Sequence, residues 1–163
     1  MKNPQQPVLW FWGHEHRLAF YGLRANQGPL RAYGRCVGNG GFPDYLHGIP
    51  DDAEQACLKV YDNRRYETVE KANLGFNGYV NLTFTANVLT VEYRSTALAK
   101  GYNKIPPEKR SRYWPLDPEK DVLLAHEKWS VDPQHGVLQG PEFHLDDEAL
   151  TQVSKLSEPC PGN

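Results

Sequence analysis

Two histidines with one residue between them, His14 and His16, are the side chains of this chain best suited to chemistry. Neutral imidazoles are the commonest metal ligands among protein side chains, and in an extended segment residues two apart project from the same face. The pair can therefore serve one metal ion or two adjacent ions. It belongs to the tetrapeptide Gly13-His14-Glu15-His16, which directly follows the apolar run of residues 8–12. We predict a metal site on a loop that Gly13 turns at the end of a strand.

Two other kinds of metal site use similar residues, and neither fits the spacing. A helical His-Glu-x-x-His zinc site needs histidines four apart, whereas His14 and His16 are two apart. A cupin-like site needs a carboxylate a few residues past the second histidine, and the first one after Glu15 is Asp44. The spacing alone still leaves open an incidental surface pair. Glu15 itself is expected to be solvated or salt-bridged.

Residues 10–16, Trp-Phe-Trp-Gly-His-Glu-His, resemble the last signature of the calcineurin-like metallophosphoesterases, a strand that leads into Gly-His-x-His. Residues 17–22 are similar to the continuation in a bacterial branch of that family, and a looser similarity covers residues 8–95. The resemblance implies the strand-rich C-terminal half of a four-layer fold, so the expected fold class is α+β or an α/β sandwich fragment. Residues 1–95 would form that half, and residues 96–163 a polar extension.

The resemblance also implies a chemistry. Members of the family hold two divalent ions, for which Mn, Fe or Zn are the candidates here. His14 would bind the ion nearer the family's Asn-His signature, and His16 would bind the other. Two ions about 3.5–4 Å apart can hold a bridging hydroxide that attacks a phosphomonoester or phosphodiester.

The other family signatures are missing from this sequence. It contains no Asp-x-His, no Gly-Asp and no Gly-Asn-His. The chain is therefore expected to be the C-terminal part of such an enzyme, inactive alone, binding metal weakly at most, and with no catalytic residue of its own. Its expected protein partner is the missing N-terminal half of the enzyme or, through self-association, another copy of the chain. The alternative hypothesis is a non-catalytic β-rich binding or interaction module with an incidental histidine pair.

The glycine-rich segment 38–41 is a candidate border for a phosphate, because successive backbone N–H groups of such turns bind anions. Asn39 is its candidate substrate-binding residue, although ordinary turn chemistry also explains the segment. The remaining histidines are expected to be ordinary surface residues: His47, His126, His135 and His144. A mixture of basic and aromatic residues between positions 102 and 114 is expected in a solvated loop.

Hydrophobic periodicity predicts several strands. The continuous apolar run 8–12 indicates a strand covered on both faces. Further strands are expected at residues 18–21, 31–37 and 122–131, and a hairpin at 78–84 and 88–94. Short helices are expected near residues 52–60 and 146–156. The rest of segment 44–71 is expected to be a surface excursion, and residues 132–163 a tail.

The bulk properties exclude some partners. The 163 residues suit one domain, and a formal charge of −2 gives no field that attracts DNA or an anionic membrane. Three cysteines without a Cys-x-x-Cys spacing suggest neither a disulfide framework nor a zinc knuckle. The first apolar run has only five residues, too few for a signal peptide or a membrane span. These features predict a soluble cytoplasmic protein.

Overall fold

The computed structural model describes residues 6–24, 31–40, 45, 48–53, 56–67, 73–95, 122–146, 150–155 and 160. The regular structure in these residues consists of strands. They are β1 (Val8–Trp12), β2 (Leu18–Arg24), β3 (Ala32–Val37), β4 (Leu58–Asp62), β5 (Arg65–Glu67), β6 (Asn73–Gly75), β7 (Gly78–Thr85), β8 (Val88–Ser95), β9 (Val122–Val131), β10 (Leu138–Leu145) and β11 (Leu150–Gln152).

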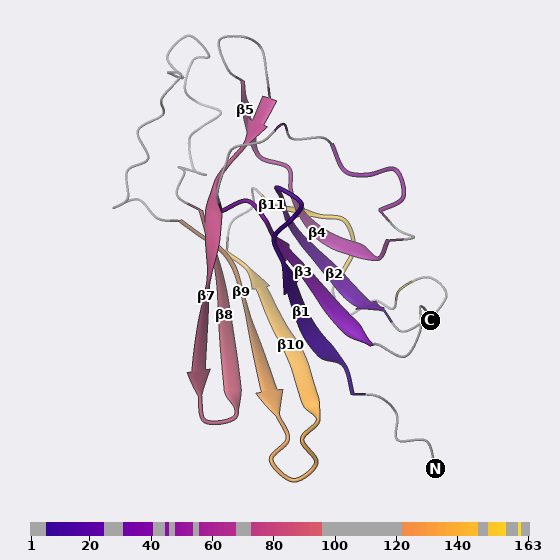
Figure 1. Cartoon of the computed structure of the whole chain (residues 1–163), viewed down its shortest axis with the longest axis vertical. Coiled ribbons are helices and arrows are strands. Elements are labelled where there is room, and N and C mark those ends of the chain that lie inside the picture. The colour runs from indigo at the N-terminus through magenta and orange to yellow at the C-terminus, as the bar shows by residue number, and fades with distance from the viewer. Residues whose placement is uncertain are drawn as a thin grey trace.

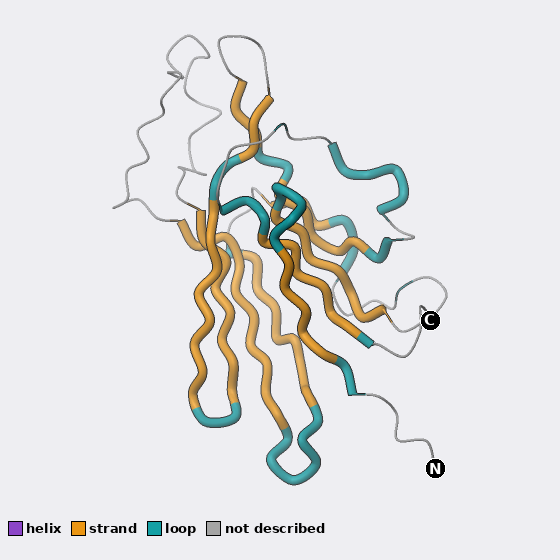
Figure 2. Tube along the Cα trace, viewed as in Figure 1, coloured by secondary structure: helices purple, strands orange, loops and turns teal. Residues whose placement is uncertain are grey.

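The strands form two larger sheets and one small ribbon (Figure 1, Figure 2). One sheet has the order β1-β3-β2-β4-β11, and the other has the order β10-β9-β8-β7. Strands β5 and β6 pair as the ribbon. Among the named pairs only β1 and β3 run parallel, with Val8 opposite Ala32 and Trp12 opposite Cys36. The carboxyl ends of β1 and β3 therefore meet at one end of the sheet.

A shared hydrophobic core lies between the two larger sheets. Phe20 on β2 packs edge-on against Tyr93 on β8, with ring centroids 4.5 Å apart. Tyr33 on β3 packs in the same manner on Trp129 of β9, at 4.8 Å. The fully or nearly fully buried members of this core are Leu18, Phe20, Val60, Val91, Tyr93, Leu124, Ala125, Trp129 and Leu150. The architecture is thus a β-sandwich.

A buried ion pair joins the two sheets. Arg35 on β3 and Glu127 on β9 are both fully buried, and the guanidinium donates to the carboxylate through Nε at 3.0 Å and Nη2 at 2.7 Å. The Tyr93 hydroxyl donates to the same carboxylate at 2.5 Å. The remaining donor of Arg35 reaches the carbonyl oxygens of Tyr21 and Gly34. Both buried charges are thus matched and hydrogen-bonded, in a contact that bridges the two sheets.

The expected α+β or α/β fold class is wrong, because the described part of the chain forms strands and no helix. The helix expected at 52–60 fails because Cys57 adopts φ 60 and residues from Leu58 onward pair in β4. The helix expected near 146–156 fails where Leu150 pairs with Asp62 of β4. In both places sheet pairing and burial override a weak local preference for helix.

Three further expectations need correction. Among the described strands β1 lies at the edge of its sheet instead of being covered on both faces, and Trp10 is 49% exposed. Segment 44–71 is more than a surface excursion, because all five residues of β4 are buried. The expected tail contains β10 and β11. The strand expected at residues 122–131 is present as β9, which pairs with β8.

A disulfide joins Cys57 to Cys160, with Cα atoms 5.2 Å apart, which corrects the expectation that the cysteines form no disulfide. Cys36 stays a free, buried thiol. Gly22 of β2 lies under the bridge, since a Cβ there would come within 2.8 Å of the Cys57 sulfur. In the described residues no helix is long and apolar enough to cross a membrane.

Candidate functional site

The tetrapeptide of residues 13–16, called the GHEH loop below, forms the bend between β1 and β2. His14 and His16 are both exposed there, and Glu15 is partly buried. Because β1 and β3 are parallel, the segment that leaves β3, residues 38–40, begins beside the GHEH loop. The histidines therefore lie on a loop at a strand end, as the sequence indicated.

Gly38 packs closely against the backbone of the GHEH loop. Its N–H donates to the carbonyl oxygen of Arg17 at 3.1 Å. A Cβ at position 38 would overlap the Glu15 carbonyl oxygen and would lie 2.6 Å from that of Gly13. A Cβ on Gly13, by contrast, would meet only the Gly38 Cα, at 3.9 Å. The close approach thus requires glycine at position 38 and not at position 13.

The Glu15 side chain is occupied by interactions with its neighbours. It forms an ion pair with Arg17 and accepts a hydrogen bond from the Trp12 indole N–H at 3.3 Å. The Cys36 thiol donates to the Glu15 carbonyl oxygen at 3.3 Å, and burial raises the pKa of that thiol. Burial also raises the pKa of Tyr21, whose hydroxyl accepts from Arg17 at 3.3 Å. Glu15 is therefore a structural part of the loop, with a salt bridge as expected.

Asn39 lies on the buried side of the glycine-rich segment. It is 7% exposed, its carbonyl oxygen accepts from the Gly78 N–H at 2.9 Å, and its amide packs against Gly78. A Cβ at Gly78 would lie 2.7 Å from the Asn39 Nδ2. The residue therefore ties the segment after β3 to the start of β7. Its substrate-binding role stays a prediction.

Two histidines that the sequence presented as isolated are neighbours. His126 on β9 lies directly opposite His144 on β10, and their ring centroids are 5.2 Å apart. The His126 Nδ1 is 2.7 Å from a carboxylate oxygen of Asp146. His135 is bound separately to Asp132 at 2.9 Å, which lowers the pKa of that carboxyl. Nearly equal distances from the turn between β9 and β10 were the sequence signal for the first pair, and the register shift between Gln139 and Glu142 brings them opposite each other.

His47 and residues 102–114 lie outside the described residues. Within the part that the structure describes, no group of three or more His, Cys, Asp or Glu side chains is placed to hold a metal ion. His14 and His16 alone leave a divalent ion short of its usual coordination number. A functional metal centre at the GHEH loop therefore needs further ligands.

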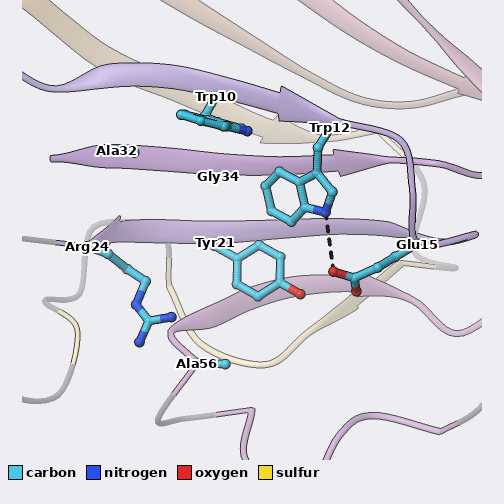
Figure 3. A pocket seen from close by; sticks show the side chains of 8 residues that line it. All are labelled: Trp10, Trp12, Glu15, Tyr21, Arg24, Ala32, Gly34 and Ala56. Carbon is cyan, nitrogen blue, oxygen red and sulfur yellow. Dashed lines mark hydrogen bonds between the residues drawn. The ribbon is translucent and has the colours of Figure 1, made fainter. Parts of the chain in front are cut away.

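A second candidate site, which the sequence did not reveal, is a trough on the outer face of the five-stranded sheet (Figure 3). Its volume is about 490 Å³. Small residues of β3 form its floor, and larger residues of β1 and β2 stand on either side. We call it the aromatic trough; it is lined by Trp10, Trp12, Glu15, Tyr21, Arg24, Ala32, Gly34 and Ala56. The alternation Trp-Phe-Trp in β1 was its only sequence signal, because the other wall comes from a different strand.

Comparisons with protein families, with characterised proteins and with solved structures find no match to this chain. Neither site gains support from a relative.

Proposed function

We propose that this chain supplies His14 and His16 as ligands to a dinuclear metal centre that hydrolyses phosphoesters. The observation that carries the proposal is the exposed histidine pair. It lies on a loop whose backbone packs closely against Gly38. A backbone packed in this manner reduces the ordering that metal binding requires. The resemblance of residues 10–16 to the metallophosphoesterase signature supplies the reaction class.

The centre is completed by residues that this sequence does not contain. A two-metal phosphoesterase needs a bridging carboxylate and further ligands. The sequence lacks Asp-x-His, Gly-Asp and Gly-Asn-His, which carry these ligands in the family. The chain alone is therefore inactive. Mn, Fe or Zn are the candidate ions, since imidazole accepts each of them.

Strand β1 is the natural place for the completing partner. Among the described residues, no strand pairs with its second edge, and Val8 and Trp10 are 39% and 49% exposed. An open, apolar strand edge is a template for another strand. We propose that the completing segment, or a second copy of the chain, adds there.

A cytoplasmic location stays a prediction from the sequence. The Cys57–Cys160 disulfide argues against it, because stable disulfides are rare in reducing compartments. No feature of composition favours a nucleic acid or a membrane surface as partner, given the net charge of −2.

The metal role is tested by titrating the intact chain with Mn²⁺ while recording the imidazole proton signals by NMR. We expect selective broadening of the His14 and His16 signals, and loss of this effect in H14A and H16A. H135A is the matched control, because His135 is an exposed histidine far along the chain. Equal broadening of all exposed histidines would refute a specific site. Chelator-sensitive hydrolysis of bis-p-nitrophenyl phosphate by the chain alone would refute the proposal that the metal centre is incomplete in this chain.

A non-catalytic β-rich binding module is the second candidate. Two observations favour it: the described residues form a β-sandwich, and they contain no complete group of metal ligands. In this case the GHEH loop is only a tight connection between β1 and β2. Mn²⁺ broadening that is no greater for the His14 and His16 signals than for the His135 signal would support this candidate over the metal centre.

A further inference from the structure

We propose that strand β7 is a self-association surface, through which two copies of this chain pair antiparallel about a two-fold axis. Strand β7 is the outermost strand of the four-stranded sheet (Figure 1). Among the described residues, no strand pairs with its second edge. The surface is independent of the edge of β1, at which a partner for the metal centre is proposed, because β1 belongs to the other large sheet.

Main-chain groups of alternate residues in β7 point toward this edge. The Gly78 N–H faces away from β8, since it donates to the Asn39 carbonyl oxygen at 2.9 Å. The hydrogen-bonding direction alternates from residue to residue along a strand, so the N–H and C=O groups of Val80, Leu82 and Phe84 also face away from β8. Beyond the contact with Asn39, the edge therefore offers donors and acceptors from three successive alternate residues.

The turn between β7 and β8 gives the same result. Its two residues connect Thr85 to Val88, which lie opposite each other. In a two-residue hairpin the residues that flank the turn exchange both of their main-chain hydrogen bonds. Thr85 therefore bonds to β8, and its neighbour Phe84 directs its main-chain groups to the open edge.

The exposed side chains at this edge are apolar. Leu82 lies opposite Val91 of β8, and Phe84 lies opposite Leu89. Val91 is buried in the core between the sheets and Leu89 packs against that core, so all four side chains share the core-facing side of the sheet. Leu82 and Phe84 are nevertheless 45% and 73% exposed. The apolar face of β7 thus continues beyond the part that the core covers, and an added strand would bury more of it.

The sequence and regularity of β7 leave its edge open to pairing. Its eight residues pair with β8 without a register shift, and they include no charged residue and no proline. Strand β10, the other edge of the same sheet, contains Pro141 and Glu142, and its register shifts between Gln139 and Glu142. Proline, charge and irregular register keep sheet edges from pairing with other chains. Strand β10 is protected in this way, whereas β7 is not.

A second copy of the chain is the occupant because β7 is complementary to itself. In an antiparallel pair centred on Leu82, this residue lies opposite its own counterpart, and Val80 lies opposite the partner's Phe84. Residues whose main-chain groups face the edge are then opposite one another, as an antiparallel ladder requires. The pairing places an aromatic ring beside a β-branched side chain twice, which is a favourable combination across strands. No like charges meet, since β7 is uncharged.

The dimer should be weak. Three residues of each copy can exchange about six main-chain hydrogen bonds, one for each N–H group. A contact between two single strands is small beside a standard protein interface of roughly 1,600 Å², and complexes below about 1,200 Å² are typically transient. The chain should therefore be a monomer in dilute solution and a dimer only when it is concentrated.

The test measures the mass of the intact chain by sedimentation equilibrium from micromolar to millimolar concentration, with metal removed by EDTA. We expect an equilibrium between monomer and dimer. Amide hydrogen exchange recorded by NMR locates the contact: exchange at Val80, Leu82 and Phe84 should slow as the concentration rises, whereas exchange at Asn81 and Thr83, which bond to β8, should not change. A monomer at every concentration, larger oligomers, or concentration-dependent protection confined to other strands would overturn the proposal.

Variants then assign the contacts. L82K places two lysines opposite each other across the two-fold axis and should weaken dimerisation at least about tenfold. F84K removes both aromatic contacts and should weaken it about 2- to 30-fold, the range for loss of two cross-strand pairs. Q139K is the matched control, because it adds the same charge at an exposed position of β10, and it should change nothing. Unchanged dimerisation in folded L82K and F84K proteins would refute the surface.

V8K distinguishes β7 from β1. Val8 lies on the edge strand of the other sheet and is 39% exposed. Dimerisation should persist in V8K and in H14A/H16A, because none of these residues belongs to β7. Loss of dimerisation in V8K, with retention in L82K, would overturn the proposal and assign self-association to β1. The Mn²⁺ response of the histidines tests the metal centre alone, and its absence leaves the β7 surface intact.

Discussion

The substitution G38A should displace the GHEH loop while leaving the chemistry of its side chains unchanged. The added methyl would overlap the Glu15 carbonyl oxygen and lie 2.6 Å from the Gly13 carbonyl oxygen. Moving the second oxygen to 3.0 Å, the shortest separation that real Cβ atoms show, requires 0.4 Å, and the Glu15 carbonyl must move further. Both obstacles are backbone atoms, so no side-chain rotation relieves the overlap.

The expected cost follows from the general cost of overpacking, about 1–3 kcal/mol. For a chain of this size each kcal/mol lowers the melting temperature by about 2–4 °C, so G38A should melt about 2–12 °C below the wild type. The imidazole signals of His14 and His16 should shift in the same variant, because their backbone has moved. Thermal unfolding by circular dichroism and NMR measure the two effects.

Two glycine substitutions serve as controls. G13A changes the glycine that faces Gly38. A Cβ at position 13 would lie 3.9 Å from its nearest neighbour, the Gly38 Cα. G48A adds a methyl where no atom lies within 4 Å. Both should melt at or slightly above the wild-type temperature, because alanine restricts the unfolded chain. A G38A protein with wild-type stability and unshifted imidazole signals would refute the role assigned to Gly38.

Two more predictions concern the interior. Y93F removes a hydroxyl that donates to buried Glu127, and should cost about 1.5–3 kcal/mol at neutral pH. Burial, and then the charge of Glu127, raises the pKa of Tyr93 well above its ordinary value of 10. The hydrogen bond therefore contributes its full stabilisation below pH 10, and this stabilisation is lost as the pH rises toward the pKa of Tyr93 in the folded protein. Urea midpoints between pH 9 and 11 should therefore fall more steeply for the wild type than for Y93F, and equal slopes would contradict this. C57S/C160S should lose about 2–5 kcal/mol, as should the wild type in dithiothreitol; a wild-type urea midpoint indifferent to the reductant would show that the bridge does not stabilise the fold.

The strands that could be predicted are those with a clear local pattern. The apolar run of β1, the alternation in β7 and β8 and the segment expected at 122–131 gave boundaries close to those observed for β1, β7, β8 and β9. Strand β10 was missed because Gly140-Pro141 interrupts it. Proline is tolerated there because β10 is an edge strand and its register shifts between Gln139 and Glu142.

Strand β4 was missed for a different reason. Its sequence, Leu-Lys-Val-Tyr-Asp, has two charged residues, yet all five positions are buried. Asp62 is buried because it pairs with Arg64 at 2.6 Å. The sequence contains both residues, but only the folded chain shows that their charges cancel inside the protein. The Pro, Asp and Asn content of segment 44–71 and its irregular apolar spacing therefore suggested a surface segment with a short helix.

The two candidate sites also differ in how much of each could be predicted from local sequence. The position of His14 and His16 at a strand end follows from local sequence, whereas the contact with Gly38 depends on the parallel pairing of β1 with β3. The aromatic trough depends on three strands at once. Residues that are distant in the sequence build the floor and the second wall, so no local pattern could have indicated them.

The environment of β1 explains why the GHEH loop is fixed although β1 lies at an edge. Its inward side chains, Leu9 and Phe11, pack against the core between the sheets. Trp12 lies over Gly34 on the outer face, where its indole N–H binds Glu15. The strand is therefore held from both faces up to the first residue of the loop. The backbone that carries both histidines is therefore positioned by contacts within the chain, so the Mn²⁺ response of the isolated chain tests the proposed centre.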